Sequence, residues 1–195
     1  NLDYYDASVM PLLEIHSCHR TYEHVARESI RRGIRFGFIG GSDDHRGALG
    51  DSHMAARERF FSSHSGLVAV YARDLTRAGL WEAFFARRVY ATNGPRIALT
   101  ARVGDTPMGG EVRLPAGTGT KLSFWTRLDG MLDRVEIMRD DACVATLQGN
   151  GNQIREFSGE QEIMPESVPH AFYVRVFQSD GGRAWSSPIW VSSLD

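Results

Sequence analysis

The chain has 195 residues, a hydrophobic share of 42% and a formal net charge of −2, as expected of a globular protein with a real core. Its 22 basic and 24 acidic residues form no basic block, which argues against nucleic-acid binding. No apolar run approaches the roughly eighteen residues of a membrane span. The two cysteines, Cys18 and Cys143, are too few for a disulfide framework and favour a reducing compartment such as the cytoplasm.

The first half of the chain alternates short apolar runs with helical patterns. Strands are expected at residues 9–16, 36–39 and 66–72, and a long loop rich in Gly, Ser, His and Asp follows the second of them, with a helical turn near 54–60. A helix is expected at 22–32, ending at Gly33, and another at 76–88, capped by Thr76. This order predicts βα units with a parallel sheet.

The pattern changes near residues 93–95, after which short strands and turns replace the helical period. Asp-Gly, Asp-Asp and Gly-Asn pairs separate the strands. Six or seven short strands at this spacing predict an antiparallel, immunoglobulin-like β-sandwich. We therefore expect an α/β domain at 1–94 and a β-sandwich domain at 95–195. The expected strands lie at 96–103, 121–128, 133–139, 143–148, 155–163, 170–178 and 185–191.

Asp43 and His45 directly follow the strand expected at 36–39. A carboxylate and an imidazole two residues apart can converge on one metal ion, and this pair of donors suits Zn, Mn or Fe better than Ca. The neighbouring glycines let the backbone turn sharply there. The same tripeptide also occurs in Asx turns that carry a surface histidine, and the sequence alone leaves that alternative open.

Glu14 and His19 lie at the end of the first expected strand. Because parallel strands end at one edge of a sheet, both side chains are expected near Asp43 and His45. A buried Glu14 needs a partner, and an arginine such as Arg20 or Arg46 would serve nearly as well as a metal. The other histidines and the first cysteine are interpreted as core, rim or solvated residues: His16, Cys18, His24, His53, His64 and His170.

Three blocks of the first half resemble a known family. They are LLEIHSCH from residue 12, GFIGGSDDHRGALG from residue 37 and GLVAVYARDLTRAGLWEAFFARRVYATNGPRI from residue 66. Together they are similar to the C-terminal part of the PHP (polymerase and histidinol phosphatase) superfamily of metal-dependent phosphoesterases. The resemblance implies a distorted (β/α) barrel, a centre of Zn, Mn or Fe, and hydrolysis of a small-molecule ester. It makes Asp43 and His45 ligands, with Glu14 and His19 as ligands or neighbours of the centre.

The family's opening His-x-His motif and its middle ligands have no counterpart in these residues. The resemblance therefore implies a partial barrel fragment, inactive in isolation, with no catalytic residue identified. Such a fragment would pair with the missing N-terminal half, associate with itself, or pack its α/β part on the sandwich.

Two alternatives remain open. One is a small hydrolase with a single metal on Glu14, His19, Asp43 and His45, completed across a dimer. The other is a non-catalytic sandwich module for interaction or carbohydrate binding. In that second case three tryptophans form either a binding face or part of the core: Trp125, Trp185 and Trp190.

Overall fold

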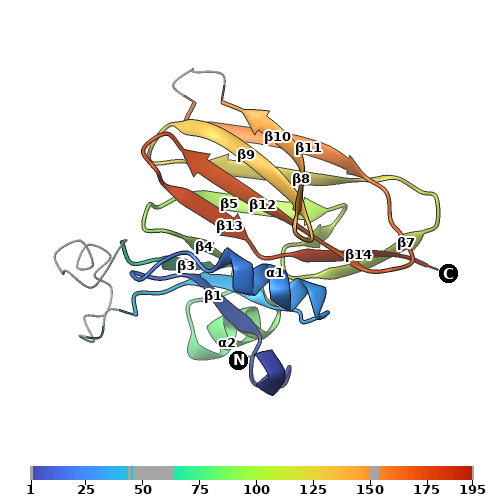
Figure 1. Cartoon of the computed structure of the whole chain (residues 1–195), viewed down its shortest axis with the longest axis horizontal. Helices are drawn as coiled ribbons and strands as arrows, with labels where there is room; N and C mark the ends of the chain where they lie inside the picture. The colour runs from blue at the N-terminus through green and yellow to red at the C-terminus, as the bar shows by residue number, and fades with distance from the viewer. Residues whose placement is uncertain (1, 44, 46–63, 150–153, 195) are drawn as a thin grey trace.

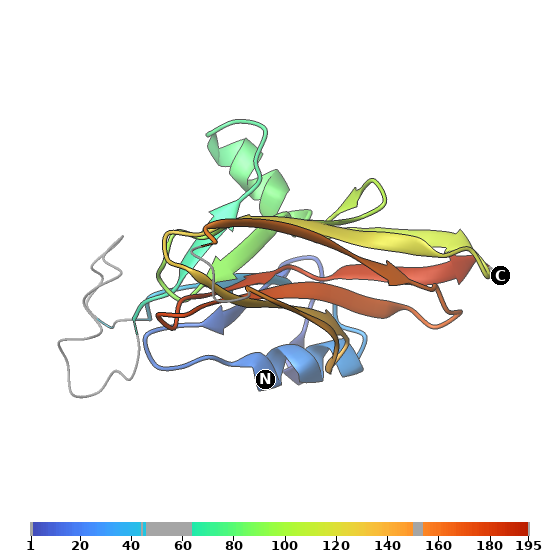
Figure 2. The same cartoon turned by 90° about the horizontal axis from the view of Figure 1, so that it is seen from above.

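The structure is a computed structural model that describes residues 2–43, 45, 64–149 and 154–194. Strands hold 48% of these described residues and helices 12%, so the described structure is mostly β. Three layers are stacked, with two β-sheets forming a sandwich and a small α/β unit covering one outer face (Figures 1 and 2). Neither helix among the described residues is long and apolar enough to cross a membrane.

The larger sheet has eight strands and draws on both halves of the sequence. Six of them follow the order β10-β9-β12-β13-β4-β3, while β14 pairs with β12 and, in parallel, with β7. Their bounds are β3 Leu67–Val70, β4 Val89–Thr92, β7 Glu111–Pro115, β9 Leu132–Arg139, β10 Ala142–Gln148, β12 His170–Gln178, β13 Arg183–Ser186 and β14 Ile189–Leu194.

The smaller sheet has the order β11-β8-β5-β6 and faces the larger one. Inward-facing apolar side chains from both sheets form the main core, including Leu99, Leu122, Ile137 and Val174, all of them fully buried. Alternation along the strands places polar residues on the opposite face. The predicted β-sandwich is therefore confirmed. The strands of the smaller sheet are β5 Ala98–Val103, β6 Thr106–Pro107, β8 Thr120–Arg127 and β11 Glu156–Ile163.

The α/β unit packs on the outer face of the larger sheet. It consists of the parallel pair β1 (Leu12–His16) and β2 (Gly37–Gly40) with helix α1 (Glu23–Arg31), preceded by a short 3-10 turn at Leu2–Tyr4. A second apolar core lies at this contact and includes Ile15, Phe38, Tyr173 and Trp185.

This second core explains why the face of β12 that carries Tyr173 is buried, although the sequence pattern predicts a solvent-exposed face. The alternation of Tyr173, Arg175 and Phe177 predicts a wetter face, yet Tyr173 is only 1% exposed. The α/β unit covers that face, so both sides of the strand are buried. Periodicity within one strand cannot reveal a layer contributed by a distant segment.

The expected barrel fragment is wrong. β3 and β4, which flank helix α2 (Arg77–Phe85), pair antiparallel with each other, and β4 then pairs antiparallel with β13 of the sandwich. Among the described residues, parallel pairing is limited to β1–β2 and β7–β14. The sequence predicts the strand at 66–72 and the helix at 76–88 as part of a parallel βα unit, but the nine-residue helix α2 instead joins β3 to a neighbouring antiparallel strand, β4, which the sequence analysis does not predict.

Apart from β4, the elements of the first half lie close to their expected positions. Thr76 caps α2 by accepting a hydrogen bond from the Gly79 amide at 3.0 Å, as predicted. Gly33, at φ 71°, follows α1. The helical turn expected near 54–60 lies outside the described residues. The domain boundary at 94/95 stays a prediction, with β4 and β13 from its two sides hydrogen-bonded in one sheet.

Candidate metal centre

The loops that leave β1 and β2 run side by side at one edge of the α/β unit. The Cys18 amide donates to the Ser42 carbonyl at 3.1 Å, and the Gly41 amide donates to the His16 carbonyl at 3.0 Å. These bonds continue the pairing of the two strands beyond their ends. Residues 17–19 and 41–43 are thereby held next to one another, as expected for the carboxyl ends of parallel strands.

Close packing of glycines fixes where the β2 loop passes. A Cβ atom on Gly40 would lie 2.7 Å from the Thr92 carbonyl oxygen and 2.8 Å from backbone atoms of Leu67. A Cβ on Gly66 would lie 2.8 Å from the His16 carbonyl oxygen. The end of β2 therefore lies directly on the backbone of β3 and β4, so the larger sheet supports the start of the loop that follows β2.

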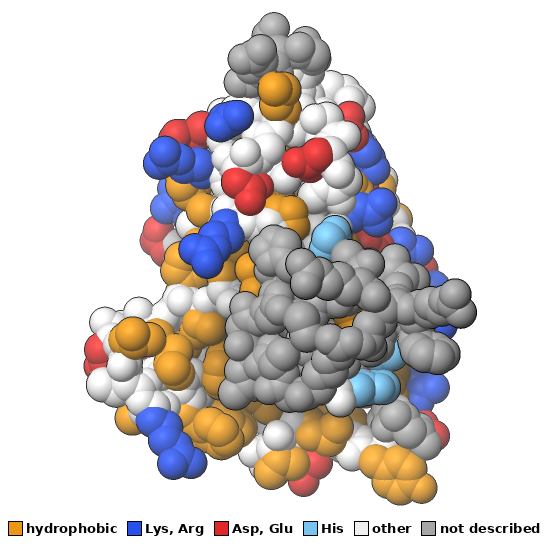
Figure 3. Space-filling view, turned by 90° about the vertical axis from the view of Figure 1, so that its left-hand side faces the viewer, with side chains coloured by type: hydrophobic (Ala, Val, Ile, Leu, Met, Phe, Trp, Pro, Cys, Tyr) orange, Lys and Arg blue, Asp and Glu red, His pale blue; other side chains and the backbone are white. Residues whose placement is uncertain are grey.

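His19, Asp43 and His45 form one cluster at this edge. The Asp43 carboxylate lies between two imidazoles, with 3.2 Å from its Oδ2 to His19 Nε2 and 3.2 Å from its Oδ1 to His45 Nε2. One ligand atom from each residue lies within 4.8 Å of the others. The two rings are 5.1 Å apart. Three metal-type donors thus converge, and histidine side chains reach the surface on this face of the molecule (Figure 3).

The backbone at the cluster adopts an uncommon conformation. Asp43 has φ 46° and His45 has φ 60°, in the left-handed region that side-chain-bearing residues seldom occupy. Asp and His are among the residues that occur there most readily. The His19 ring also lies 3.1 Å from the Asp43 carbonyl oxygen, and the Cys18 thiol donates to that same oxygen at 3.3 Å. The loop is therefore tied to the end of β1 at several points.

Glu14 stands behind the cluster, on β1. Its Oε2 lies only 2.1 Å from where a Cβ on Gly41 would be, so the carboxylate fills the space that this glycine leaves. Burial raises the pKa of the Glu14 carboxyl above its ordinary value, the charge of Asp43 raises that pKa further, and His19 opposes the shift. All four sequence-predicted residues therefore belong to one electrostatic neighbourhood. Within the described part of the chain, Glu14 forms no ion pair with an arginine, and Arg46 lies outside it.

His16 is a buried structural residue, as expected from its place in the first strand. It is 3% exposed, and its Nδ1 lies 2.8 Å from the Thr21 hydroxyl. Its Nε2 lies 3.0 Å from the His64 carbonyl oxygen, to which it donates, because a carbonyl can only accept. Both ring nitrogens make hydrogen bonds within the protein, and neither is left to bind a metal ion. Cys18 is buried, as expected, and His53 lies outside the described residues.

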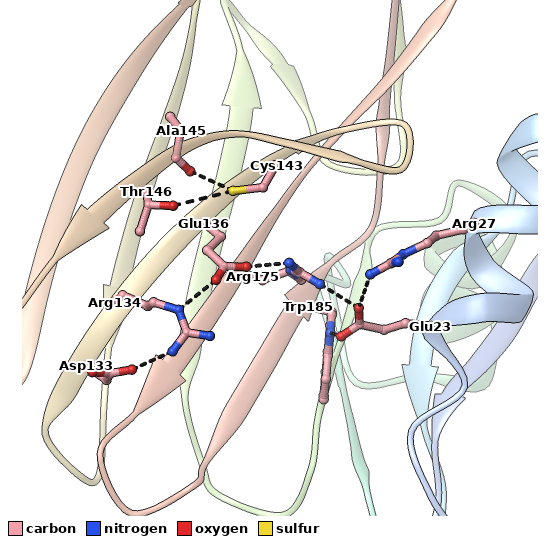
Figure 4. A network of polar contacts seen from close by, with 10 residues as sticks. All are labelled: Glu23, Arg27, Asp133, Arg134, Glu136, Cys143, Ala145, Thr146, Arg175 and Trp185. Carbon is pink, nitrogen blue, oxygen red and sulfur yellow. Dashed lines mark hydrogen bonds and ion pairs between the residues drawn. The ribbon is translucent and has the colours of Figure 1, made fainter.

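A second polar network, which the sequence analysis does not predict, lies between α1 and the larger sheet. Arg175 on β12 contacts Glu23 of α1 and Glu136 of β9, and the Trp185 indole donates to Glu23 at 2.8 Å (Figure 4). The partners lie far apart in the chain, so no local motif marks them. His170, given no role from sequence, contacts Asp140 at 2.6 Å in a further such cluster.

Comparison with known proteins finds one family of unknown function and several uncharacterized relatives. Residues 50–106 match a family model described as "Protein of unknown function (DUF3604)". An uncharacterized protein of Chlamydia pneumoniae is 34% identical over 84% of this chain and 28% of its own length. One from Chlamydia trachomatis is 29% identical over 87% of this chain and 29% of its own length. The chain thus spans less than a third of these relatives.

Among solved structures, a fibronectin(III)-like module of Clostridium thermocellum CbhA is similar to part of this chain. It matches with a TM-score of 0.36 and 19% identity, over 48% of this chain and 93% of the module.

These findings overturn the resemblance to the PHP superfamily. The family model matches residues 50–106, which overlap the block from residue 66 that carried much of that resemblance, and it describes a different family. The fold agrees, because β3 and β4 belong to an antiparallel sheet rather than to a barrel. Assignment as a fragment of a PHP phosphoesterase is therefore wrong, and the metal-type cluster must be judged on its own geometry.

Proposed function

We propose that this chain binds one divalent transition-metal ion through His19, Asp43 and His45. The supporting observation is the convergence of their ligand atoms within 4.8 Å. A tetrahedral ion with bonds of about 2.0–2.2 Å needs ligand atoms roughly 3.3 Å apart. Each Asp43 carboxylate oxygen lies 3.2 Å from one imidazole nitrogen, Oδ2 from that of His19 and Oδ1 from that of His45, which is close to that spacing. Two imidazoles and one carboxylate suit Zn, Mn or Fe.

The exposure of the cluster favours a reactive site over a purely structural one. Side-chain exposure is 47% for Asp43 and 67% for His45, so solvent or a substrate can reach an ion there. An ion with three protein ligands keeps a position for water and lowers the pKa of that water to about 7. We therefore propose hydrolysis of a small ester at this site, with a second copy of the chain covering its open side.

Metal titration tests the first part of this proposal. Zn²⁺ titrated calorimetrically into EDTA-stripped protein should bind at one ion per chain. Loss of a residue that contacts only a ligand of the metal typically weakens metal binding by roughly tenfold to hundredfold. His45→Ala removes a ligand itself and should weaken Zn²⁺ binding by at least as much. His24→Ala is the matched control, because His24 is an exposed histidine of α1 outside the cluster. Equal Zn²⁺ affinity in wild type and His45→Ala would overturn the site.

Turnover of p-nitrophenyl phosphate and p-nitrophenyl acetate tests the second part. Activity should require added Zn²⁺ or Mn²⁺, rise with protein concentration faster than linearly, and be lost in His45→Ala. Tight stoichiometric metal binding without turnover would leave the metal site standing and reject the hydrolase.

Replacing Gly41 with alanine should weaken metal binding while leaving the fold intact. The new methyl group would occupy the position of the Glu14 carboxylate, which is the movable end of a flexible side chain. We expect a loss of up to about tenfold in Zn²⁺ affinity, in the range of outer-sphere changes. Calorimetry measures the affinity, and circular dichroism checks the fold. Unchanged affinity would show that Glu14 has no influence on the ion.

A second candidate function is non-catalytic ligand binding by the sandwich, which the mostly-β fold favours. The structure separates the three tryptophans that could form a binding face. Trp185 is fully buried and Trp190 is 6% exposed, so both belong to the core. Trp125 lies on the outer face of the smaller sheet, where a ligand can contact it.

A further inference from the structure

The outer face of the smaller sheet carries a hollow of about 710 Å³. It lies over the middle of β8, which is paired on both sides, with β5 and with β11. Its lining combines one tryptophan, two charged side chains and several small polar ones. The lining residues are Thr100, Arg102, Ser123, Phe124, Trp125, Ser158, Gly159 and Glu160.

Strand register explains why the sheet is hollowed here. Trp125 lies directly between Thr100 on β5 and Ser158 on β11, and these two short side chains leave the indole standing beside open space. One step along the sheet, the short Ser123 lies between Arg102 and Glu160. One row across the three strands therefore has Trp125 at its centre. The next row has the small Ser123 at its centre and a charged residue on either side.

The indole is fixed in orientation. Trp125 Nε1 donates a hydrogen bond to Glu156 Oε1 at 3.0 Å. This bond occupies the polar edge of the ring and leaves its apolar faces as the contact surface. A large ring that is already oriented costs little conformational entropy when a ligand binds to it.

The charged flanks are arranged to bind hydroxyl groups. The Glu160 carboxylate accepts from Lys121 at 2.7 Å and from Ser123 at 3.3 Å. The Arg102 guanidinium makes no side-chain hydrogen bond with another described residue, although its charge helps lower the pKa of Glu160, after the larger effect of Lys121. Donors and acceptors thus face one another across the hollow with little net charge.

We propose that this face binds a neutral oligosaccharide chain. A sugar ring presents an apolar C–H face, which the electron-rich face of Trp125 would contact, and an edge of hydroxyls, which Arg102, Glu160 and the small hydroxyl side chains would bind. Pockets that combine an aromatic wall with a few placed polar groups are typical of small-ligand sites. The inference rests on the sandwich acting as a binding module and is independent of the metal site.

Other ligand classes fit this face less well. An extended peptide would add along the outer edge of β11, whereas Trp125 projects from the face of β8, which is paired on both sides. A nucleic acid needs a positive surface, and here Glu156 and Glu160 offset Arg102 and Lys121. The hollow also lacks the apolar groove that an amphipathic helix requires.

Affinity electrophoresis tests the proposal on the full chain. Native gels containing hydroxyethyl cellulose, xylan, glucomannan, soluble starch or dextran should retard the wild type in at least one case. Trp125→Ala should weaken that binding by about tenfold or more, as expected for loss of a central aromatic contact. Ser158→Ile, which fills the hollow with a strand-favouring side chain and keeps the hydrogen bond of Trp125 to Glu156, should weaken it similarly.

Two controls make the outcome decisive. Trp81→Ala removes a tryptophan that is 60% exposed on α2 and does not line the hollow, and this variant should bind like wild type. His45→Ala should also bind like wild type, which separates this result from the metal proposal. Absence of retardation in all five gels, or equal retardation of wild type and the folded Ser158→Ile variant, would overturn the saccharide site.

Discussion

Replacing Arg175 with alanine should lower the free energy of unfolding by about 3–5 kcal/mol, because it removes the cation that two largely buried carboxylates share. Arg175 Nη1 donates to Glu23 Oε2 at 2.6 Å, and its Nη2 donates to Glu136 Oε2. The side chains of all three residues are less than a fifth exposed. The guanidinium therefore links helix α1 to the larger sheet through charges that are shielded from water.

Arg175 joins two further ion pairs into one network. Glu136 also accepts from Arg134 Nε at 2.6 Å, and Glu23 accepts from Arg27 at 3.2 Å (Figure 4). Burial alone would lower the pKa of Arg175, but the charges of Glu23 and Glu136 outweigh it and raise that pKa. Removing the central cation leaves each carboxylate with fewer partners in a site where solvent cannot replace them.

Urea denaturation of Arg175→Ala and wild type measures the difference. Arg32→Ala is the matched control, since the Arg32 side chain is 44% exposed and pairs with Glu28 and Asp3 on the surface. That control should lose no more than about 1 kcal/mol. A loss in Arg175→Ala as small as in the control would show that the network contributes nothing beyond surface pairing.

The pH dependence supplies an independent check on the same network. Burial tends to raise the pKa of Glu136, but Arg134 and Arg175 outweigh it and lower that pKa below its ordinary value of 4.5. A lowered folded-state pKa means that the stabilisation is present above pH 4.5 and is lost as pH falls further. The difference between wild type and Arg175→Ala should therefore shrink below that pH.

The candidate metal cluster was predictable because its signal is local. Asp43 and His45 lie two residues apart after an apolar run, and Glu14 and His19 end a similar run. Parallel pairing of β1 and β2 then brings the two groups together. To predict that these side chains lie together, only the parallel pairing of the two strands has to be known, and the structure has that pairing.

The architecture around the cluster was not predictable in the same way. The apolar run before Tyr71 and the capped helix after Thr76 are compatible with a parallel crossover or with an antiparallel pair, and the choice depends on pairing with β13, which lies about ninety residues later in the chain. The network of Glu23 and Arg175 is likewise invisible, because its members are 152 positions apart. Long-range pairing leaves no periodic trace in the sequence.

Replacing Trp185 with alanine should lower the free energy of unfolding by about 3–5 kcal/mol as well. Trp185 is fully buried in the core between the α/β unit and the larger sheet. Its ring stacks on the His16 ring at 6.0 Å, and its Nε1 donates to Glu23 at 2.8 Å. The substitution removes a large apolar volume and one hydrogen bond to a charged group together.

Three variants divide this loss into its parts. Trp185→Phe keeps a ring in the core and removes the bond to Glu23, for an expected cost of about 1.5–3 kcal/mol. Trp81→Ala, with its 60% exposed side chain, should stay within about 0.5 kcal/mol of wild type. The double variant of Trp185→Phe and Arg175→Ala should lose less than the sum of the single losses, because both residues bind Glu23.

Trp185→Ala should also affect the metal site, because Trp185 contacts β1, the strand that precedes His19. His16, which stacks on Trp185, stands three residues before His19, and its carbonyl accepts from the Gly41 amide at 3.0 Å. Trp185→Ala should therefore weaken Zn²⁺ binding at temperatures where the variant is still folded, while Trp125→Ala on the far sheet should not. Zn²⁺ affinity that is unchanged in folded Trp185→Ala would mean that the loops hold the cluster without help from the sandwich.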